Sequence, residues 1–126
     1  MPSSNSIPPK DRRVATGHEF ERLAERFYVD KGFDILERNW RAGRKEIDLI
    51  VRKRDVIVFV EVKSSASKRF GHPVERVDRR KRENLAHCAR QYIIAQDLSG
   101  VDLRFDVITF VDGKLEHYPN AFEDST

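Results

Sequence analysis

The chain has 126 residues, of which 36% are charged and 39% are hydrophobic, and this balance suits one domain with a real core. Its 24 basic residues outnumber its 21 acidic ones, and the sequence pI of about 9.2 weakly indicates nucleic-acid binding. The single cysteine, Cys88, excludes an intramolecular disulfide and a cysteine-rich zinc site. The sequence has no recognisable signal peptide or membrane span, so we expect a cytoplasmic protein that does not enter the membrane.

The chain is predicted to begin with a tail and a helix. Residues 1–16 are polar and contain three prolines, so we expect a flexible N-terminal tail. Thr16 and Glu19 then fit a capping box, and Gly32 stands where a helix would end. The apolar residues that recur at helical spacing between these signals are Phe20, Leu23, Ala24, Phe27 and Tyr28. The pattern predicts a helix with one apolar face.

Three strands are predicted to follow this helix, at residues 33–40, 46–51 and 56–63. A basic turn that contains Gly43 separates the first two strands, and a short charged turn separates the second from the third. A second helix is predicted over residues 77–95. Its expected apolar stripe consists of Val77, Leu85, Cys88, Ala89, Tyr92 and Ile93.

The last predicted elements form a hairpin. A strand is predicted at residues 103–111 and a short partner strand at residues 114–118, with Asp112 and Gly113 as the turn signal. The folded domain is therefore expected to span residues 17–119, and residues 120–126 to form a flexible C-terminal tail. The element order α-β-β-β-α-β, with a final hairpin strand, predicts an α/β sandwich around a central mixed sheet.

The third predicted strand ends with a charged pair. Residues 56–62 read V-I-V-F-V-E-V, and Lys63 follows. Such apolar runs are typical of strands buried on both faces, where a charged group is costly unless it is paired or bound to an ion. Glu61 and Lys63 share a strand face, and the preceding strand adds Glu46 and Asp48. Two interpretations fit equally well: a nuclease metal site, or a buried ion pair between Lys63 and one of the acids.

Six motifs along the chain occur in an order that resembles a known family. They are G-x-x-x-E-x-x-A from Gly17, I-L-E-R-N-W-R from Ile35, E-I-D-L-I from Glu46, V-F-V-E-V-K from Val58, F-G-x-P-x-E-x-V from Phe70 and R-F-D-V from Arg104. On these motifs the chain resembles the YraN family of uncharacterised bacterial nuclease-like proteins, within the PD-(D/E)XK superfamily. Its first half is also similar to archaeal Holliday junction resolvases. The resemblance implies a restriction endonuclease-like αβββαβ fold.

The resemblance also implies roles for four residues of the central strands. Asp48 and Glu61 would be catalytic carboxylates that bind Mg²⁺ or Mn²⁺, because these ions prefer hard oxygen ligands. The backbone carbonyl of Val62 would be a further metal ligand. Lys63 would orient or polarise the attacking water, or stabilise the charge that develops in the transition state.

Two further acids are candidates for the same site. The family pattern points Glu21, on the first helix, toward the metal through a bound water; a solvated helix acid is the alternative. Glu46 shares a face with Asp48 at about 7 Å along the strand and would be a further catalytic ligand, or would pair with Lys45 or with the neighbours of Lys63 at the sheet edge. The family usually has Gly directly before this acid, where the present chain has Lys45.

Several basic residues are predicted to contact nucleic acid, mainly where the second helix begins. The predicted binding residues are Arg76, Arg79, Arg80, Lys81, Arg44 and Lys45, with Arg41, Lys68 and Arg69 extending the groove. The alternative for the helix is a solvated face balanced by neighbouring acids. Trp40 is expected to pack in the core or to stack on a base. Asp106 is expected to form a structural ion pair with Arg104.

Taken together, these features predict a metal-dependent nuclease that cleaves phosphodiester bonds, of DNA in preference to RNA, in branched or single-stranded substrates. One alternative is a nucleic-acid-binding module that keeps the fold without cleavage. Another is a protein-interaction domain with a charged surface. Cleavage of a DNA junction would require a symmetric homodimer.

Overall fold

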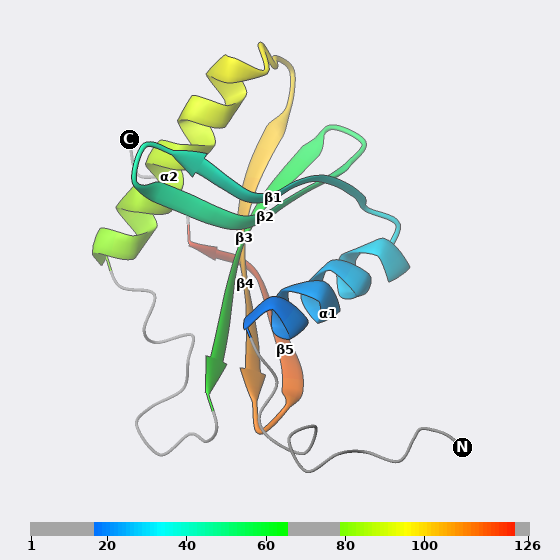
Figure 1. The fold of residues 1–126 in the computed structure, drawn as a ribbon. Helices are drawn as coiled ribbons and strands as arrows, with labels where there is room; N and C mark the ends of the chain where they lie inside the picture. The colour runs from blue at the N-terminus through cyan, green and yellow to red at the C-terminus, as the bar shows by residue number, and fades with distance from the viewer. Residues whose placement is uncertain (1–16, 66–78, 123–126) are drawn as a thin grey trace.

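The computed structural model describes residues 17–65 and 79–122 of the chain. In this part of the chain two helices and five strands follow one another in the predicted order (Figure 1). Their bounds are α1 Gly17–Asp30, β1 Asp34–Ala42, β2 Lys45–Lys53, β3 Val56–Ser65, α2 Arg79–Ala95, β4 Asp102–Val111 and β5 Lys114–Phe122. The predicted N-terminal tail, with Thr16, and the predicted start of the second helix at Val77 lie outside the described residues.

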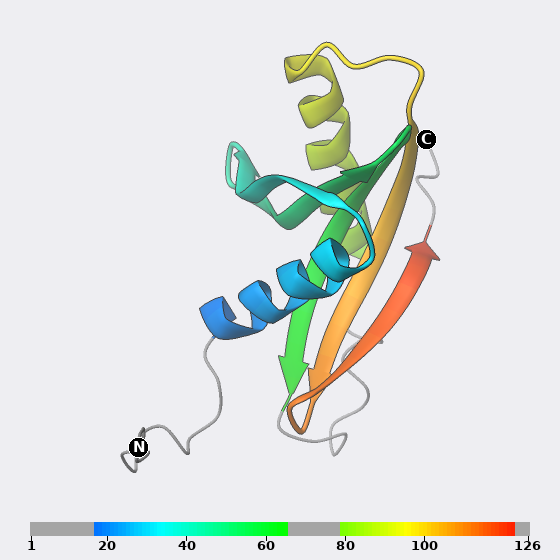
Figure 2. The same cartoon turned by 90° about the vertical axis from the view of Figure 1, so that its right-hand side faces the viewer.

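The five strands form one mixed sheet, and the helices cover its opposite faces. The strands lie in sequence order; β3 and β4 pair in parallel, and the other neighbouring pairs are antiparallel. A parallel pair needs a crossover connection, and the chain makes it through α2 (Figure 2). Val58 and Val60 of β3 pack in the core beneath α1, whereas Ile57 and Phe59 pack beneath α2. The predicted αβββαβ sandwich is confirmed.

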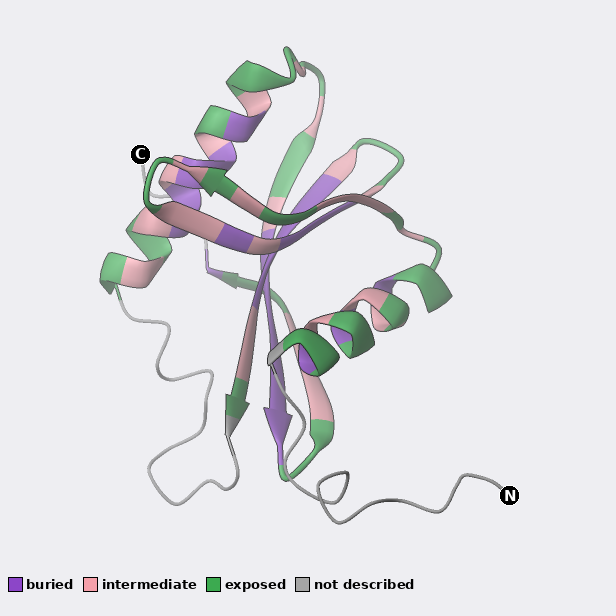
Figure 3. Cartoon of the chain, viewed as in Figure 1, coloured by how far each residue is buried: buried purple, intermediate pink, exposed green. Residues whose placement is uncertain are grey.

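Helix α1 buries a narrower stripe than its sequence predicts. Phe20, Ala24 and Tyr28 are buried at intervals of four residues, and Phe27 is partly buried beside them (Figure 3). Leu23 is 50% exposed, so its prediction as a core residue is wrong. The reason is geometric, since side chains four apart lie above one another on one face, and α1 rests on the sheet along that face alone.

Helix α2 packs as predicted, with Leu85, Cys88, Ala89 and Tyr92 buried against the sheet. The Trp40 ring of β1 meets the Tyr92 ring edge to face, with centroids 5.2 Å apart. Trp40 is therefore part of the core packing. No described helix is both long enough and apolar enough to cross a bilayer.

Strand β5 is four residues longer than predicted and ends at Phe122. The Phe122 ring is buried and stacks on Phe105 of β4, with centroids 5.0 Å apart. Residues 120–122 therefore belong to the sheet, which corrects their prediction as part of a tail. Asn120 has a φ of 51° directly after Pro119, and a register shift in the β4–β5 ladder accommodates these two residues at the sheet edge.

The sheet forks where β2 and β3 stop pairing. Their ladder ends at the pair Leu49–Val60, beyond which β2 continues beside β1 and β3 continues beside β4 (Figure 1). Ile47 packs on the α2 side of the sheet and Leu49 on the α1 side, although residues two apart in a regular strand share a face. Strand β2 thus twists through Asp48. The fork places Asp48 and Glu61 directly beyond the last paired residues.

Candidate functional site

Asp48 on β2 and Glu61 on β3 lie next to each other at the fork. Their carboxyl groups are in hydrogen-bonding contact. The Val62 N–H lies beyond the β2–β3 ladder and donates to Asp48 Oδ2 at 2.8 Å. Glu61 is almost wholly buried, with 3% of its surface exposed, and Asp48 is half-buried. The two acids that the sequence singled out are therefore brought together.

Two lysines hold the Glu61 carboxylate. Lys63 Nζ lies 3.2 Å from Glu61 Oε2, as expected for residues that share a strand face. Lys81 Nζ reaches the same oxygen from α2, at 3.1 Å. The ion pair predicted as one interpretation of Lys63 is thus present. Lys81, predicted as a phosphate contact, belongs to the same charged cluster.

The electrostatics of this cluster strongly perturb Asp48. Burial raises the pKa of the Asp48 carboxyl to about 7; repulsion from Glu61 adds to this effect, and the Val62 N–H opposes it. Burial lowers the pKa of Lys81, but the combined attraction of Glu61, Asp48 and Glu46 outweighs burial, and the pKa lies above its usual value. Crowded carboxylates flanked by cations are a pattern that clusters at functional sites.

Glu21 and Glu46 lie around the acid pair. Burial raises the pKa of Glu21, and repulsion from Glu46 and Glu61 adds to the rise. The Glu21 carboxylate also accepts a hydrogen bond of 3.4 Å from Asn39 Nδ2. Glu46 pairs with Arg41 Nη2 at 3.1 Å across the β1–β2 hairpin. Glu21 therefore faces the acid pair. Glu46 does form an ion pair, but with Arg41, which is not among the partners predicted for it.

Two pockets open onto Asp48 from different sides. One, of about 380 Å³, lies between α1 and the β1–β2 ribbon, and besides Asp48 it is lined by His18, Glu21, Arg22, Glu25, Arg38, Asn39 and Leu49. The other, of about 190 Å³, lies between the β1–β2 turn and α2, and besides Asp48 it is lined by Arg44, Lys45, Glu46, Lys81, Asn84 and Leu85. Arg44 and Lys45 thus line a pocket beside Asp48, and their contact with nucleic acid stays a prediction.

The other predicted nucleic-acid contacts are more scattered. Arg79 is exposed and pairs with Glu83 at 3.1 Å, which is the solvated-face alternative for this residue. Arg80 is exposed on the same turn of α2. Arg76, Lys68 and Arg69 lie outside the described residues. Sequence reasoning did not single out Arg38, which reaches the larger pocket from β1; nothing in its local pattern marks it, because the pocket arises from the packing of α1 against β1.

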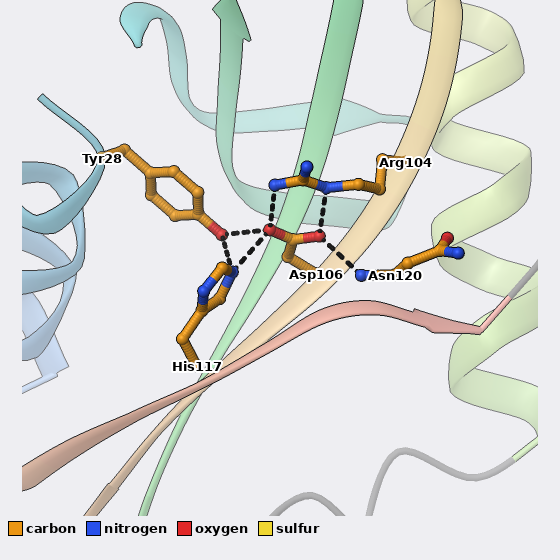
Figure 4. A network of polar contacts seen from close by, with 5 residues as sticks. All are labelled: Tyr28, Arg104, Asp106, His117 and Asn120. Atoms are coloured by element: carbon orange, nitrogen blue, oxygen red, sulfur yellow. Dashed lines mark hydrogen bonds and ion pairs between the residues drawn. The ribbon is translucent and has the colours of Figure 1, made fainter. Parts of the chain in front are cut away.

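A second buried carboxylate, Asp106 on β4, is fully satisfied. Arg104 binds both of its oxygens with two N–H groups, each at 2.9 Å. Tyr28 Oη donates at 2.7 Å, the Asn120 N–H donates at 2.9 Å, and His117 Nε2 lies at 2.8 Å (Figure 4). Burial favours the neutral acid, but these contacts outweigh it and hold the pKa of Asp106 below its usual value. The predicted Arg104 ion pair is confirmed, within a network that ties α1 to β4 and β5.

The acid pair can be tested for its fit to a metal ion. Within residues 17–65 and 79–122, no group of three or more His, Cys, Asp or Glu side chains is placed to hold a metal. Mg²⁺ needs fewer protein ligands, since one or two carboxylates usually bind it while waters and substrate phosphates complete its shell. Asp48 and Glu61 offer two carboxylates in contact, beside the backbone of Val62. This oxygen-only donor set fits Mg²⁺ or Mn²⁺ and does not fit zinc.

Comparison with known proteins identifies the family. The model of the uncharacterised protein family UPF0102 matches residues 20–110. A UPF0102 protein of Persephonella marina is 37% identical over 107 residues, which cover 85% of this chain and 92% of the relative. Relatives from Clostridioides difficile and Chloroherpeton thalassium, also UPF0102 proteins, are 40% identical over 104 residues (81% of this chain and 91% of the relative) and 41% identical over 111 residues (88% and 84%). The chain therefore belongs to the uncharacterised protein family UPF0102, the YraN family whose motifs its sequence resembles.

Proposed function

We propose that this protein is a divalent-metal-dependent nuclease that hydrolyses phosphodiester bonds. The observation that carries the proposal is the contact between Asp48 and Glu61, with Lys63 on the same carboxylate and pockets opening onto Asp48. Two acids and a lysine at one point are poorly explained by stability alone, because burial, with repulsion from Glu61 adding to it, raises the pKa of Asp48 to about 7. Phosphodiester hydrolysis uses this combination of groups.

Asp48 and Glu61 would hold the ion, with the Val62 carbonyl as a further oxygen ligand. When bound, the ion supplies Lewis-acid stabilisation of the negative charge that develops on the phosphate. Ion binding also removes the repulsion between the two carboxylates, and Asp48 would then lose its proton at neutral pH.

Lys63 and Lys81 provide the positive groups of the mechanism. Both ammonium groups contact Glu61 Oε2, so each is held in place by a buried partner. Lys63 would orient the attacking water or donate to the phosphate oxygen on which charge develops. Lys81, on α2, would stabilise the same charge from the side of the smaller pocket.

Nucleic acid is the substrate class that the walls of the site favour. Arg44 and Lys45 line the smaller pocket, and such residues contact phosphates without reading sequence. DNA, in branched or single-stranded form, is the proposed substrate in preference to RNA. On a four-way junction, paired cuts would require a homodimer that presents two such sites.

Cleavage assays with matched variants test the proposal. The substrates are duplex, single-stranded and four-way-junction DNA, and the corresponding RNAs, each with Mg²⁺ or Mn²⁺. Asp48→Asn and Glu61→Gln should each reduce cleavage by about 100-fold or more, since each removes a charge that the ion needs. Binding in EDTA should hold or tighten in both variants, because a charge that repels phosphate is gone. Lys63→Ala should stop cleavage while leaving metal affinity largely intact.

The control is Asp112→Asn, the same chemical change in an exposed turn where φ is 53° and Asn is well tolerated. It should cleave like the wild type. If the wild type cuts none of these substrates with either ion, the nuclease proposal fails. If it cuts and Asp48→Asn cuts equally well, the active site lies elsewhere. Thermal melts of every variant separate lost activity from lost folding.

A non-catalytic nucleic-acid-binding module is the second candidate, and one observation favours it. Lys63 and Lys81 already neutralise Glu61, so the cluster is balanced as a structural ion pair. Under this alternative, binding without cleavage persists in Asp48→Asn.

If Arg80 contacts phosphate in either case, Arg80→Gln should reduce the slope of log affinity against log salt by about 0.9 on duplex DNA, and Lys114→Gln, at the exposed β4–β5 turn, should not.

A further inference from the structure

A separate pocket, of about 590 Å³, lies at the other end of β2 and β3 from the acid pair. The segment after α1, the β2–β3 turn and the nearby residues of β4 and β5 enclose it. Lys53 in its wall is five residues from Asp48 along β2, which corresponds to about 17 Å. Its lining residues differ from those of both pockets at Asp48.

The lining of this pocket is strongly basic. Lys31, Lys53, Arg54 and Arg104 contribute to it, and among the described lining residues there is no Asp or Glu. The buried Asp106 carboxylate lies behind Arg104 and cancels one of these charges, so the net charge is 4 − 1 = +3 with His117 neutral. Like charges gathered around one hollow are stabilised by an anion that enters it.

Two of these cations are held in place by the fold. Lys53 Nζ donates to the Lys31 carbonyl at 3.0 Å and lies 5.6 Å from the centre of the Phe33 ring. Arg104 uses two N–H groups on Asp106 (Figure 4), and a guanidinium has five, so three remain for a ligand. Cations fixed in this way lose little side-chain freedom when an anion binds.

The rest of the wall is apolar. Phe33, Val56 and Pro119 line the pocket beside the cations. A pocket of several hundred cubic ångströms with an apolar wall and a few charged groups suits a small ligand that has an anionic and a flat apolar part. Phosphate matches the cations, because the fork of a guanidinium and the ammonium groups both pair well with phosphate oxygens.

We propose that this pocket binds the phosphate of a nucleotide, either free or at the end of a nucleic-acid strand. The site is independent of the acid pair and does not require the protein to be a nuclease. Its occupant would contact Lys31, Arg54 and Arg104 through phosphate oxygens and Phe33 through the base.

Binding measurements on the full chain test this site. The ligands are inorganic pyrophosphate, a nucleoside diphosphate, the matching nucleoside, and a short single-stranded oligonucleotide with and without a 5′ phosphate, all in EDTA. The double variant Lys31→Gln with Arg54→Asn removes two charges and leaves Lys53, Arg104 and Asp106 in place; Asn suits the φ of 56° at position 54. We expect it to weaken binding of the phosphorylated ligands at least about tenfold, as for lost charge-assisted hydrogen bonds.

The matched control removes two exposed charges elsewhere, through Arg26→Gln with Lys114→Gln, and should leave this binding unchanged. Asp48→Asn should also leave it unchanged, which separates this pocket from the acid pair. Loss confined to the free nucleotide, or to the 5′-phosphorylated strand, identifies the source of the phosphate. The proposal is overturned if no phosphorylated ligand binds the wild type at millimolar concentration, if the nucleoside binds as well as its diphosphate, or if the control loses binding equally.

Discussion

Two carboxylates of one sheet, the buried Asp106 and the half-buried Asp48, have opposite surroundings. Asp106 has five polar contacts from Tyr28, Arg104, His117 and the Asn120 backbone, and its pKa lies below the usual value. Asp48 accepts the Val62 N–H and lies against another carboxyl group, and its pKa rises to about 7.

The difference teaches how to separate a structural acid from a candidate functional one. Burial alone disfavours both charges, and what distinguishes them is whether the fold supplies donors to compensate. Asp106 receives those donors from three elements and needs no ligand. The Asp48–Glu61 pair retains a repulsion that an external cation would relieve. An unrelieved repulsion beside an open pocket is unfavourable for folding, and such locally unfavourable arrangements are expected at functional sites.

The largest effect is expected at the satisfied acid. Asp106→Ala strands Arg104, Tyr28 and His117 in a buried site, and it should reduce the free energy of unfolding by about 3–5 kcal/mol, as for a broken buried ion pair. Chemical denaturation measures the change. Asp106→Asn keeps one acceptor oxygen and should lose less. A loss below about 1 kcal/mol in the alanine variant would show that the network is not a stabilising anchor.

The crowded acid should behave in the opposite way, with a clear pH dependence. The pKa of Asp48 in the folded protein, about 7, lies above its ordinary value of 3.8, so the stability linked to its protonation is fully present below pH 3.8 and is lost as pH rises through 7. Asp48→Asn lacks this loss. Relative to wild type, the variant should therefore gain stability between pH 4 and pH 7, by up to about 4 kcal/mol, and then level off.

Denaturation at several pH values, for both proteins at the same ionic strength, measures that difference. Asp112→Asn is the control, because the same change in an exposed turn should give a difference that stays nearly constant with pH. A difference between wild type and Asp48→Asn that does not vary from pH 4 to pH 8 would contradict the raised pKa.

A divalent ion should sharpen the contrast, because it stabilises only the crowded pair. At pH 8, Mg²⁺ or Mn²⁺ at ten times its dissociation constant should stabilise the wild type by about 1.4 kcal/mol. Asp48→Asn and Glu61→Gln should lose most of this gain, while Tyr28→Phe at the other acid should keep it. Melting temperatures with EDTA, Mg²⁺ and Mn²⁺ provide the readout. Equal metal stabilisation of wild type and Asp48→Asn would place the ion elsewhere.

The smallest effect is expected from removing one donor among several. Tyr28→Phe deletes the 2.7 Å hydrogen bond to Asp106 and leaves Arg104, His117 and the Asn120 N–H in place. The expected loss is about 1 kcal/mol, typical of one hydrogen bond. Chemical denaturation compares it with Phe27→Leu, a change in a neighbouring partly buried ring that makes no such bond. A loss as large as that of Asp106→Ala would mean that the hydroxyl, and not the guanidinium, holds the network together.

Local pattern was enough to predict the elements and the pairing of Asp48 with Glu61. Apolar residues that recur every 3.6 residues indicate a helix, and those that alternate every 2 residues indicate a strand. The elements predicted in this way are present in the structure from α1 to β4. Two consecutive strands joined by a tight turn must pair side by side, so acids at equal distances from that turn meet across them. The charged pair Glu61–Lys63 follows from the strand period in the same way.

Tertiary structure alone decided the features that depend on contacts between distant segments. Lys81 reaches Glu61 because α2 packs against the sheet 20 residues later in the chain, and no local signal distinguishes Lys81 from the other bases in its run. Asp106 gathers donors from residues 28 to 120, and β5 extends to Phe122 because Phe105 offers it a stacking partner. Leu23 stays exposed since α1 touches the sheet along one stripe. The periodicity of a segment predicts which of its residues can be buried. Tertiary packing decides which neighbours bury them, and those neighbours determine the pKa of each acid.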